Sequence, residues 1–235
     1  AMDGAKAIDL CRTTTETATG KQRTWGVISA AYMLPDGTTV GSTYQANFDL
    51  GHGILSKFGA DPSKPANSKP QLGKSLLGLS SGTARDPSDT GYQSVGGFSK
   101  GYTSSPPQGF TPKNSTGCTA TGGSPHDGAA LKLTIRVPTN ANSFTFKSAF
   151  FTYEYPSFVC TTYNDYYVAI MSPAPAKITD GDIVLDQDGN PVSVNNSFLQ
   201  VCSPGSHGGK TFTCPQGTAM LTGTGFESHG STGWL

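Results

Sequence analysis

The feature that most constrains this chain is a run of alternating apolar and polar residues over residues 130–137. Its apolar members are Leu131, Leu133, Ile135 and Val137, and Lys132, Thr134 and Arg136 lie between them. Successive side chains of a β-strand point to opposite faces, so this pattern predicts a strand with one buried face and one solvent-exposed face. Strands of this kind are typical of antiparallel sheets.

Further strands are predicted at residues 25–34, 143–153 and 166–171. Residues 183–194 carry a hairpin signature, because the Asp-Gly pair at its centre supplies the positive-φ positions of a tight turn. The 30 glycines and 16 prolines disfavour helix and suit turns. We therefore predict one all-β domain over residues 1–235, an antiparallel, jelly-roll-like β-sandwich with long Gly/Pro-rich loops.

The longest of these loops is predicted over residues 51–125, which are mostly Gly, Pro, Ser and Lys around one apolar run at residues 76–79. A structureless connection of this length in a compact domain is usually functional. We expect this region to take part in binding.

The five cysteines lack the Cys-x-x-Cys spacing of a structural zinc site and favour disulfides in an oxidising compartment. Cys202 and Cys214 bracket a short Gly-rich loop and are predicted to pair. Among Cys11, Cys118 and Cys160 one must remain unpaired, and the sequence leaves open which.

Charge excludes some partners. Lys plus Arg equals Asp plus Glu at 16 each, without a run of one sign, so capture of nucleic acid or of an anionic membrane is unsupported. No apolar run is long enough to cross a bilayer, and no signal peptide is present, so we expect any export signal to have been removed. A glycan, peptide or neutral surface is the expected partner.

Two central segments carry a family resemblance. Residues 151–160, Phe-Thr-Tyr-Glu-Tyr-Pro-Ser-Phe-Val-Cys, and 163–169, Tyr-Asn-Asp-Tyr-Tyr-Val-Ala, resemble the hallmark of the bacterial choice-of-anchor L domain. Further matches lie at residues 51–55, 79–85, 126–128, 191–196 and 232–235, so the resemblance spans almost the whole chain. It implies export to the bacterial surface, secreted or anchored, and a β-rich domain of mostly unassigned activity.

The resemblance also implies a difference at the end of the chain. Family members continue past the Gly-Trp-Leu with further strands and an acidic motif, whereas this sequence stops at Leu235. We therefore expect a sandwich without its last strands, either because the chain is shortened or because another chain completes the open edge by strand addition.

Oxygen ligands flank the loop between the two hallmark segments. Glu154, Asn164 and Asp165 together suit calcium, which binds carboxylates and amide carbonyls in flexible arrangements. The alternative is that Glu154 and Asp165 hydrogen-bond the loop backbone. The loop tyrosines Tyr155 and Tyr163 are candidates for stacking on sugar rings.

Weaker catalytic candidates are His126, Asp127 and Glu154. An imidazole beside a carboxylate suits acid–base or metal chemistry, and His52 would complete a zinc site with His126 and Asp127. A turn-forming Asp127 beside Gly128 explains the same residues. Residues 80–83 lack the Gly-x-Ser-x-Gly elbow of a serine hydrolase, and residues 186–189 begin like a calcium loop but end as a hairpin turn.

Three functions follow as expectations. The first is an extracellular binding or adhesion module, stabilised by calcium, that recognises a glycan or a surface partner. The second is a secreted metal-dependent hydrolase in which Glu154 or Asp165 acts as a base with His126. The third is a subunit of a surface assembly that receives a strand at its open edge.

Overall fold

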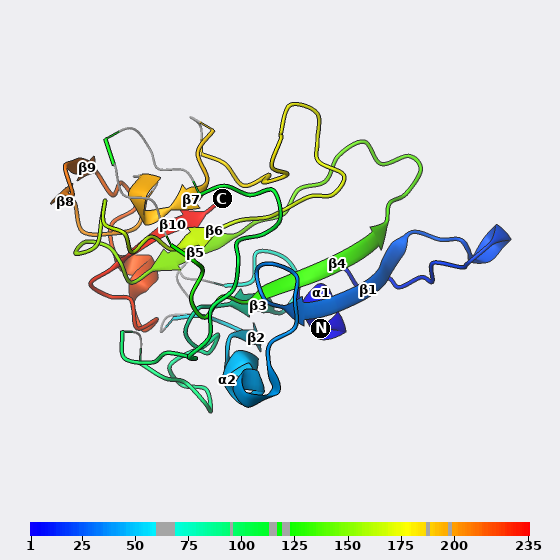
Figure 1. Ribbon diagram of the computed structural model, residues 1–235, viewed down its shortest axis with the longest axis horizontal. Helices are drawn as coiled ribbons and strands as arrows, with labels where there is room; N and C mark the ends of the chain where they lie inside the picture. Colours follow the sequence, from blue (N-terminus) through cyan, green and yellow to red (C-terminus); the bar gives the residue numbers. More distant parts are fainter. Residues whose placement is uncertain (60–68, 95, 113–116, 119–122, 187–188, 197–198) are drawn as a thin grey trace.

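The structure is a computed structural model that describes residues 1–235 except 60–68, 95, 113–116, 119–122, 187–188 and 197–198 (Figure 1). The described strands are β1 (Gly26–Met33), β2 (His52–Leu55), β3 (Leu76–Leu79), β4 (Ala130–Arg136), β5 (Ala149–Thr152), β6 (Tyr166–Tyr167), β7 (Val192–Ser193), β8 (Gly205–His207), β9 (Lys210–Phe212) and β10 (Gly230–Trp234). The helices are α1 (Met2–Ala7), α2 (Gln45–Leu50) and the 3₁₀ turns η1 (Gly20–Gln22), η2 (Ser42–Tyr44), η3 (Val194–Asn196) and η4 (Ala219–Leu221). The fold is mostly β with few helices, as predicted.

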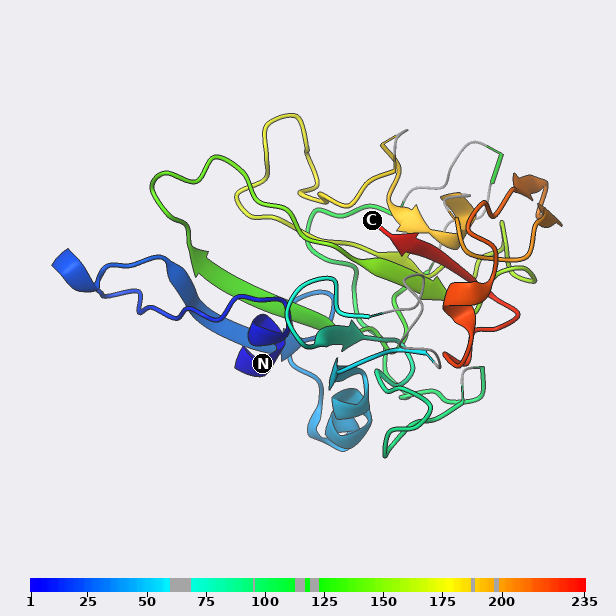
Figure 2. The ribbon, with the colours of Figure 1, turned by 180° about the vertical axis from the view of Figure 1, so that it is seen from behind.

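Within the described residues the strands form five antiparallel pairs: β1–β4, β2–β3, β5–β10, β6–β7 and β8–β9. Figures 1 and 2 show β5 and β10 side by side, with the C-terminus at the end of β10. Each pair is a two-stranded sheet, so the jelly-roll sandwich stays a prediction.

The alternating segment at residues 130–137 forms β4, which pairs with β1 from Gly26↔Arg136 to Met33↔Ala130. Lys132 and Thr134 are exposed and the leucines between and before them are partly buried, so the predicted alternation is confirmed over residues 131–134. The short helix α1 lies against β1 and also contacts β2 and β3 (Figure 1). A Cβ at Gly4 would stand 2.5 Å from the Tyr32 hydroxyl, so this close approach depends on glycine.

The region expected to be one long loop, residues 51–125, contains two strands that pair with each other. The apolar run at 76–79 is β3, and it pairs with β2 from His52↔Leu79 to Leu55↔Leu76. The expectation of a structureless connection is therefore wrong for these residues. The strand was not predicted because the segment Leu-Leu-Gly-Leu contains no β-branched or aromatic residue and is only four residues long.

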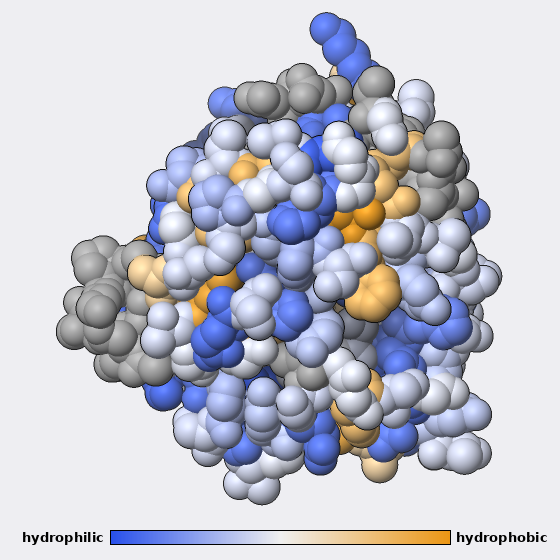
Figure 3. Space-filling model, turned by 90° about the vertical axis from the view of Figure 1, so that its left-hand side faces the viewer, coloured by the Kyte–Doolittle hydropathy of each residue, from blue (hydrophilic) through white to orange (hydrophobic). Residues whose placement is uncertain are grey.

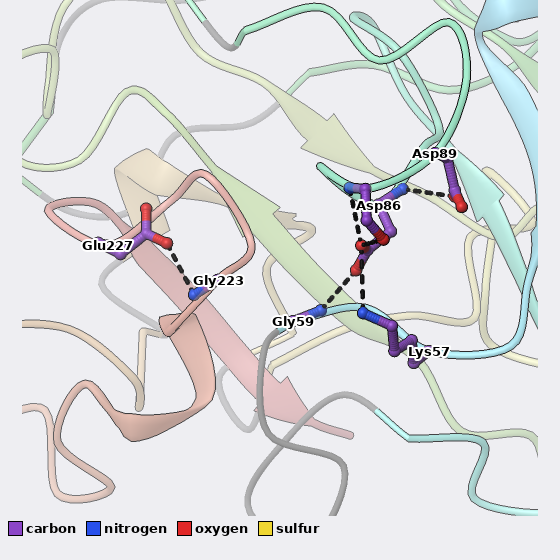
Figure 4. A network of polar contacts seen from close by, with 7 residues as sticks. Lys57, Gly59, Asp86, Asp89, Gly223 and Glu227 are labelled. Atoms are coloured by element: carbon purple, nitrogen blue, oxygen red, sulfur yellow. Dashed lines mark hydrogen bonds and ion pairs between the residues drawn. The ribbon is translucent and has the colours of Figure 1, made fainter.

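Buried Asp86 fixes the chain where it leaves β2 and β3. Its carboxylate accepts hydrogen bonds from the Gly59 amide (3.0 Å), the Ser88 hydroxyl (2.6 Å) and the Lys57 Nζ (3.3 Å), and its own amide donates to Asp89 (Figure 4). Burial opposes ionisation, but the hydrogen bonds from Ser88, Gly59 and Lys57 outweigh it and hold the pKa of Asp86 below its usual value. Asp86 is therefore an ionised anchor that joins residues 57–59 to residues 86–89.

Three of the predicted strands are shorter than expected. Only residues 149–152 of the segment 143–153 form a strand, and Phe144 and Phe146 lie before it with 60% and 43% of their surfaces exposed. Only residues 166–167 of the segment 166–171 do so. The hairpin at 183–194 is present as a Leu185↔Pro191 bridge, with part of its turn outside the described residues, but β7 pairs with β6.

The largest core cluster surrounds a disulfide. Cys202 and Cys214 are bonded, as predicted, and a second disulfide joins Cys118 to Cys160. The cysteine without a partner is the exposed Cys11. Packed around the first disulfide are Tyr155, Val159, Val194, Leu199 and Phe212. Two disulfides are typical of proteins that fold in an oxidising compartment.

One face of the molecule is mostly polar. Figure 3 shows the face at the left of Figure 1, where hydrophilic residues dominate and apolar ones form small separate groups. Among the described residues, no helix is both long enough and apolar enough to cross a membrane.

Replacing Cys202 and Cys214 together by alanine is expected to lower the free energy of unfolding by about 3 kcal/mol, because the bond closes a loop between cysteines 12 residues apart. Chemical denaturation under non-reducing conditions measures the change. Replacing the unpaired Cys11 by alanine is the control and is expected to leave the stability unchanged. Equal stability of the double variant and the control would show that the disulfide adds nothing to the core.

Candidate functional site

The loop of residues 153–165 joins β5 to β6 and is built by local hydrogen bonds. The Phe158 amide donates to the Glu154 carbonyl (2.8 Å), and the Thr161 hydroxyl donates to the Phe158 carbonyl (2.8 Å). The disulfide at Cys160 ties the loop to residue 118. These bonds hold the loop in a fixed turn, and we call it the 153–165 loop.

Tyr155 anchors the loop in the core. Its side chain is 1% exposed, its hydroxyl donates to the Ser203 carbonyl, and its ring packs 4.9 Å from that of Phe212. The prediction that Tyr155 contacts a ligand is therefore corrected, because a ring enclosed on both faces cannot stack on a sugar. The turn at the start of the loop directs this tyrosine inward.

Tyr163, the second tyrosine predicted to bind, lies on the surface with 65% of its area exposed. Its ring stands edge-on to that of Phe158, with centroids 5.4 Å apart, and Phe158 is 40% exposed. Phe158 was not predicted as a site residue, because only the tyrosines of this loop were considered as stacking candidates. Together, Phe158 and Tyr163 form an exposed aromatic pair at the tip of the loop.

The carboxyl groups of Glu154 and Asp165 lie close together at the base of the same loop. Oε2 of Glu154 accepts a hydrogen bond from the Asp165 amide at 2.8 Å. Burial and the neighbouring charge of Asp165 raise the pKa of Glu154 to about 8, and burial raises that of Asp165. None of the described residues donates a hydrogen bond to the Asp165 carboxylate. We call these two groups the carboxyl pair.

Asn164 plays a mainly structural part. Its Oδ1 accepts a hydrogen bond from the Asn195 amide (3.3 Å), and its side chain hydrogen-bonds the Tyr166 hydroxyl. Asn195 is fully buried, accepts from the Cys160 amide (2.6 Å) and donates to the Thr161 carbonyl (3.3 Å). This second asparagine, which the sequence did not identify as a site residue, joins η3 to the 153–165 loop.

The carboxyl pair has two chemical uses. At neutral pH it holds a proton, because burial and like charge disfavour two carboxylates side by side. A cation could bind in place of that proton. The carboxylate oxygens of the pair are ligands of the kind that calcium selects. Within the described parts of the chain, no three His, Cys, Asp or Glu side chains gather closely enough to hold a metal ion, so Asn164, carbonyl oxygens or water would have to complete the shell.

His126 and Asp127, the other predicted pair, form a turn. Asp127 has a left-handed backbone, with φ of 56°, and its carboxylate accepts hydrogen bonds from Ser99 Oγ (2.9 Å) and from the amides of Lys100 (2.9 Å) and Tyr102 (3.1 Å). His126 is exposed and its backbone bridges residue 103. The turn-forming interpretation of Asp127 therefore accounts for the pair.

His52 is the third residue of the predicted zinc site, and its side chain contacts Tyr32 and Asp49. Its ring stacks on Tyr32 with centroids 3.7 Å apart, and its Nε2 lies 3.6 Å from Asp49 Oδ1. Burial lowers the pKa of His52, and the charge of Asp49 opposes this only in part. None of these described contacts involves His126 or Asp127, so the structure gives the zinc interpretation no support.

A buried lysine was also not predicted from the sequence. Lys100 has no exposed surface, its Nζ donates to the Ser80 carbonyl (2.7 Å), and the same atom lies 5.4 Å from the centre of the Tyr102 ring. Burial lowers the pKa of Lys100 to about 8, although the charge of Asp127 opposes the change. It fills the interior between β2 and the turn at Asp127.

Asp127→Ala is expected to destabilise the protein by about 3 kcal/mol or more, because it leaves three donors without their acceptor. The matched control is the adjacent His126→Ala, for which no measurable loss is expected. Urea denaturation of both variants measures the difference. If His126→Ala were the more damaging change, His126 rather than Asp127 would have the structural role.

Glu154→Gln is expected to alter the pH dependence of stability. Between pH 4.5 and 8 the unfolded chain loses a proton that folded Glu154 retains, so wild-type stability falls as pH rises through this range. The variant lacks this loss and is expected to exceed the wild type by about 1 kcal/mol or more at pH 8, and to match it at pH 4. The measurement, made without added metal, is thermal unfolding across pH.

The control for this experiment is Glu227→Gln. Glu227 also accepts a backbone hydrogen bond, from the Gly223 amide at 2.8 Å, but it is exposed (Figure 4). This variant is expected to keep the wild-type pH profile. If the stability of Glu154→Gln changed with pH in parallel with that of the wild type, the pKa of Glu154 would not be raised in the folded protein.

Comparison with known proteins does not identify a family: no family model, no curated protein and no solved structure matches the chain. The resemblance to the choice-of-anchor L domain therefore stays a prediction from residues 151–169 and the shorter motifs.

Proposed function

We propose that this protein is an exported binding module, and that its 153–165 loop presents the aromatic pair Phe158 and Tyr163 to a neutral glycan while calcium at the carboxyl pair stabilises the loop. The observation that carries the proposal is the combination, on one loop, of an exposed aromatic pair with two adjacent, partly buried carboxyls. In this proposal the loop stands on a jelly-roll-like sandwich of the choice-of-anchor L type, at a bacterial surface.

The aromatic tip supports glycan binding. Aromatic rings offer a large, rigid apolar area, and the C–H groups on one face of a pyranose complement such a ring. The edge-on contact between Phe158 and Tyr163 restricts both rings before a ligand arrives, and this lowers the side-chain freedom lost on binding. The zero formal net charge of the chain also suits a neutral ligand.

The carboxyl pair supports the calcium part of the proposal. Asp165 is partly buried beside a second carboxyl, and its carboxylate accepts no hydrogen bond from the described residues. A divalent cation would supply the missing opposite charge, and it would fix the end of the loop that is next to Tyr163. The two disulfides support export, since disulfides persist in oxidising compartments.

The hydrolase alternative has less support. It requires His126 to work with Glu154 or Asp165, but the described contacts of His126 are with residue 103, whereas Glu154 contacts the Asp165 amide. A general acid at Glu154 alone remains compatible with its raised pKa. The binding module needs no residue beyond those that the loop already brings together.

The calcium part is tested by thermal unfolding with and without millimolar Ca²⁺. We expect stabilisation of the wild type by about 2–3 kcal/mol at 100 times the dissociation constant, larger at pH 8 than at pH 5 because protons compete for the carboxyls. Glu154→Gln and Asp165→Asn are expected to lose the effect, and Glu227→Gln to keep it. An equal calcium effect in all four proteins would remove the carboxyl pair from the proposal.

The glycan part is tested on a broad glycan array with calcium present. We expect retention by the wild type and a loss of about tenfold or more in Tyr163→Ala, because an exposed aromatic anchor carries the contact. Tyr44→Ala, which removes an exposed tyrosine from another part of the surface, is the control. A blank array with folded, calcium-treated protein would refute glycan binding without affecting the calcium result.

A further inference from the structure

The chain just before β1 carries an arginine stacked on an exposed tryptophan. The Arg12 guanidinium lies over the Trp25 ring, 5.4 Å from its centroid. Arg12 is exposed, and so is 39% of the surface of Trp25. Figures 1 and 2 show the turn η1, which lies between these two residues in the sequence, at one end of the molecule, beyond β1 and β4. We call Arg12 and Trp25 the Arg–Trp pair.

Backbone contacts hold both members of the Arg–Trp pair in place. The Val27 amide donates to the Arg12 carbonyl (2.8 Å), and the Thr14 amide donates to the Val27 carbonyl (3.0 Å), so that residue 13 forms a parallel bridge with Val27. A Cβ at Gly26 would lie 2.7 Å from the Arg12 carbonyl oxygen, so this close approach depends on glycine. The position of the pair is therefore fixed before any ligand binds.

A second arginine nearby has a different role. Arg136 is opposite Gly26 at the end of β4, and it donates to Thr14 Oγ1 (3.0 Å) and to the Glu16 carbonyl (2.8 Å). It thereby ties the segment before β1 to β4. Among the described residues, the Arg12 guanidinium has neither a hydrogen-bond acceptor nor an ion-pair partner. Its fork of donors matches the two oxygens of a carboxylate.

The end of the molecule around the Arg–Trp pair is positively charged. Residues 10–25 together with Arg136 contain four cationic side chains and one carboxylate, that of Glu16. The two acceptors of Arg136 are a hydroxyl and a carbonyl, so its charge is not neutralised. Because the formal net charge of the whole chain is zero, the rest of the protein carries the balancing negative charge. An acidic ligand would therefore be attracted to this end.

Exposed aliphatic side chains lie at the same end of β4. Ile135 pairs with Val27, and continuing the register past Gly26↔Arg136 places Val137 opposite Trp25. Ile135 and Val137 expose 38% and 62% of their surfaces. Covering such side chains with apolar groups of a ligand is favourable. The surface thus combines a free guanidinium with an aromatic and an aliphatic area.

We propose that the Arg–Trp pair is the centre of a docking site for an acidic segment of a partner protein. A Glu or Asp carboxylate of the partner would form a bidentate pair with Arg12, and an adjacent apolar side chain would pack on Trp25 and Val137. Trp and Arg are among the residue types that most often dominate the binding energy of protein interfaces.

A protein segment fits this surface better than a sugar does. The Arg12 guanidinium already covers one face of the indole, so a pyranose ring cannot stack there. The aliphatic groups of Ile135 and Val137 gain more from the apolar side chains of a peptide than from the hydroxyl groups of a sugar. The site is independent of the proposed glycan site, because none of these contacts involves the 153–165 loop.

The test selects binders of the whole chain from a displayed library of random heptapeptides. We expect the enriched sequences to contain Glu or Asp next to Leu, Val, Phe or Tyr. Each enriched peptide is then synthesised in two forms, one with its carboxylates and one with the corresponding amides, and calorimetry measures both affinities. The amide form is expected to bind about tenfold or more weakly. The affinity of the carboxylate form is expected to fall as the NaCl concentration rises.

Variants assign the site. Arg12→Gln and Trp25→Ala are expected to weaken binding of the carboxylate peptide by about tenfold or more. Arg12→Lys, which keeps the charge but not the planar fork, is expected to weaken it by a few-fold. Lys132→Gln removes an exposed cation from β4 and is the matched control, expected to bind as the wild type does. Arg12 and Trp25 are exposed, so these variants are expected to fold, and thermal unfolding checks this.

Three results would overturn the proposal. No enrichment, or enriched peptides without a carboxylate, would show that the surface does not select acidic segments. Equal affinity of Arg12→Gln and Lys132→Gln for the carboxylate peptide would place binding elsewhere. A dimer of the protein alone that Arg12→Gln dissociates, measured by sedimentation, would assign the Arg–Trp pair to a contact with a second copy of the chain.

Discussion

The structure depends on buried side chains that accept hydrogen bonds from loop backbone. Its strands are short, so the sheet pairs leave many amides to be satisfied in other ways. Asp86, Asp127 and Asp182 perform this task, each receiving at least two backbone amides. Asn195 does the same for the turn at Cys160 and adds a donor of its own. Without these four side chains the loops would contain buried amides without partners.

The carboxyl pair differs from these anchors because it receives fewer hydrogen-bond donors, and this difference makes it a candidate for binding a proton or a cation. Asp86 receives several donors, and its pKa falls, whereas the carboxyl pair receives one amide for two groups, and the pKa of Glu154 rises to about 8. The same residue types therefore serve as anchors in one place and as a candidate cation site in another. Burial opposes ionisation in both places; at Asp86 the hydrogen bonds outweigh it, whereas at the carboxyl pair burial and like charge prevail.

The sequence predicted the features that depend on neighbours along the chain. Strands β1 and β4, the Cys202–Cys214 bond and the mostly β class follow from alternation, spacing and composition. The sequence did not predict features that depend on contacts between segments far apart along the chain. Tyr155 is buried because Phe212 and Ser203 surround it, and residues 143–148 have a strand pattern but lack a partner over most of their length. The structural roles of Asn195 and Lys100 depend on contacts that no local pattern contains.

The two disulfides close loops of different size, and this affects the route of oxidative folding. Cys202 and Cys214 are 12 residues apart and meet by local motion, whereas Cys118 and Cys160 are 42 apart and compete with the exposed Cys11. Every bond that Cys11 forms must be exchanged before the native set is complete. The yield of correctly bonded protein therefore depends on the rate at which the core around Tyr155 brings Cys160 to Cys118, and thus on kinetics rather than on final stability.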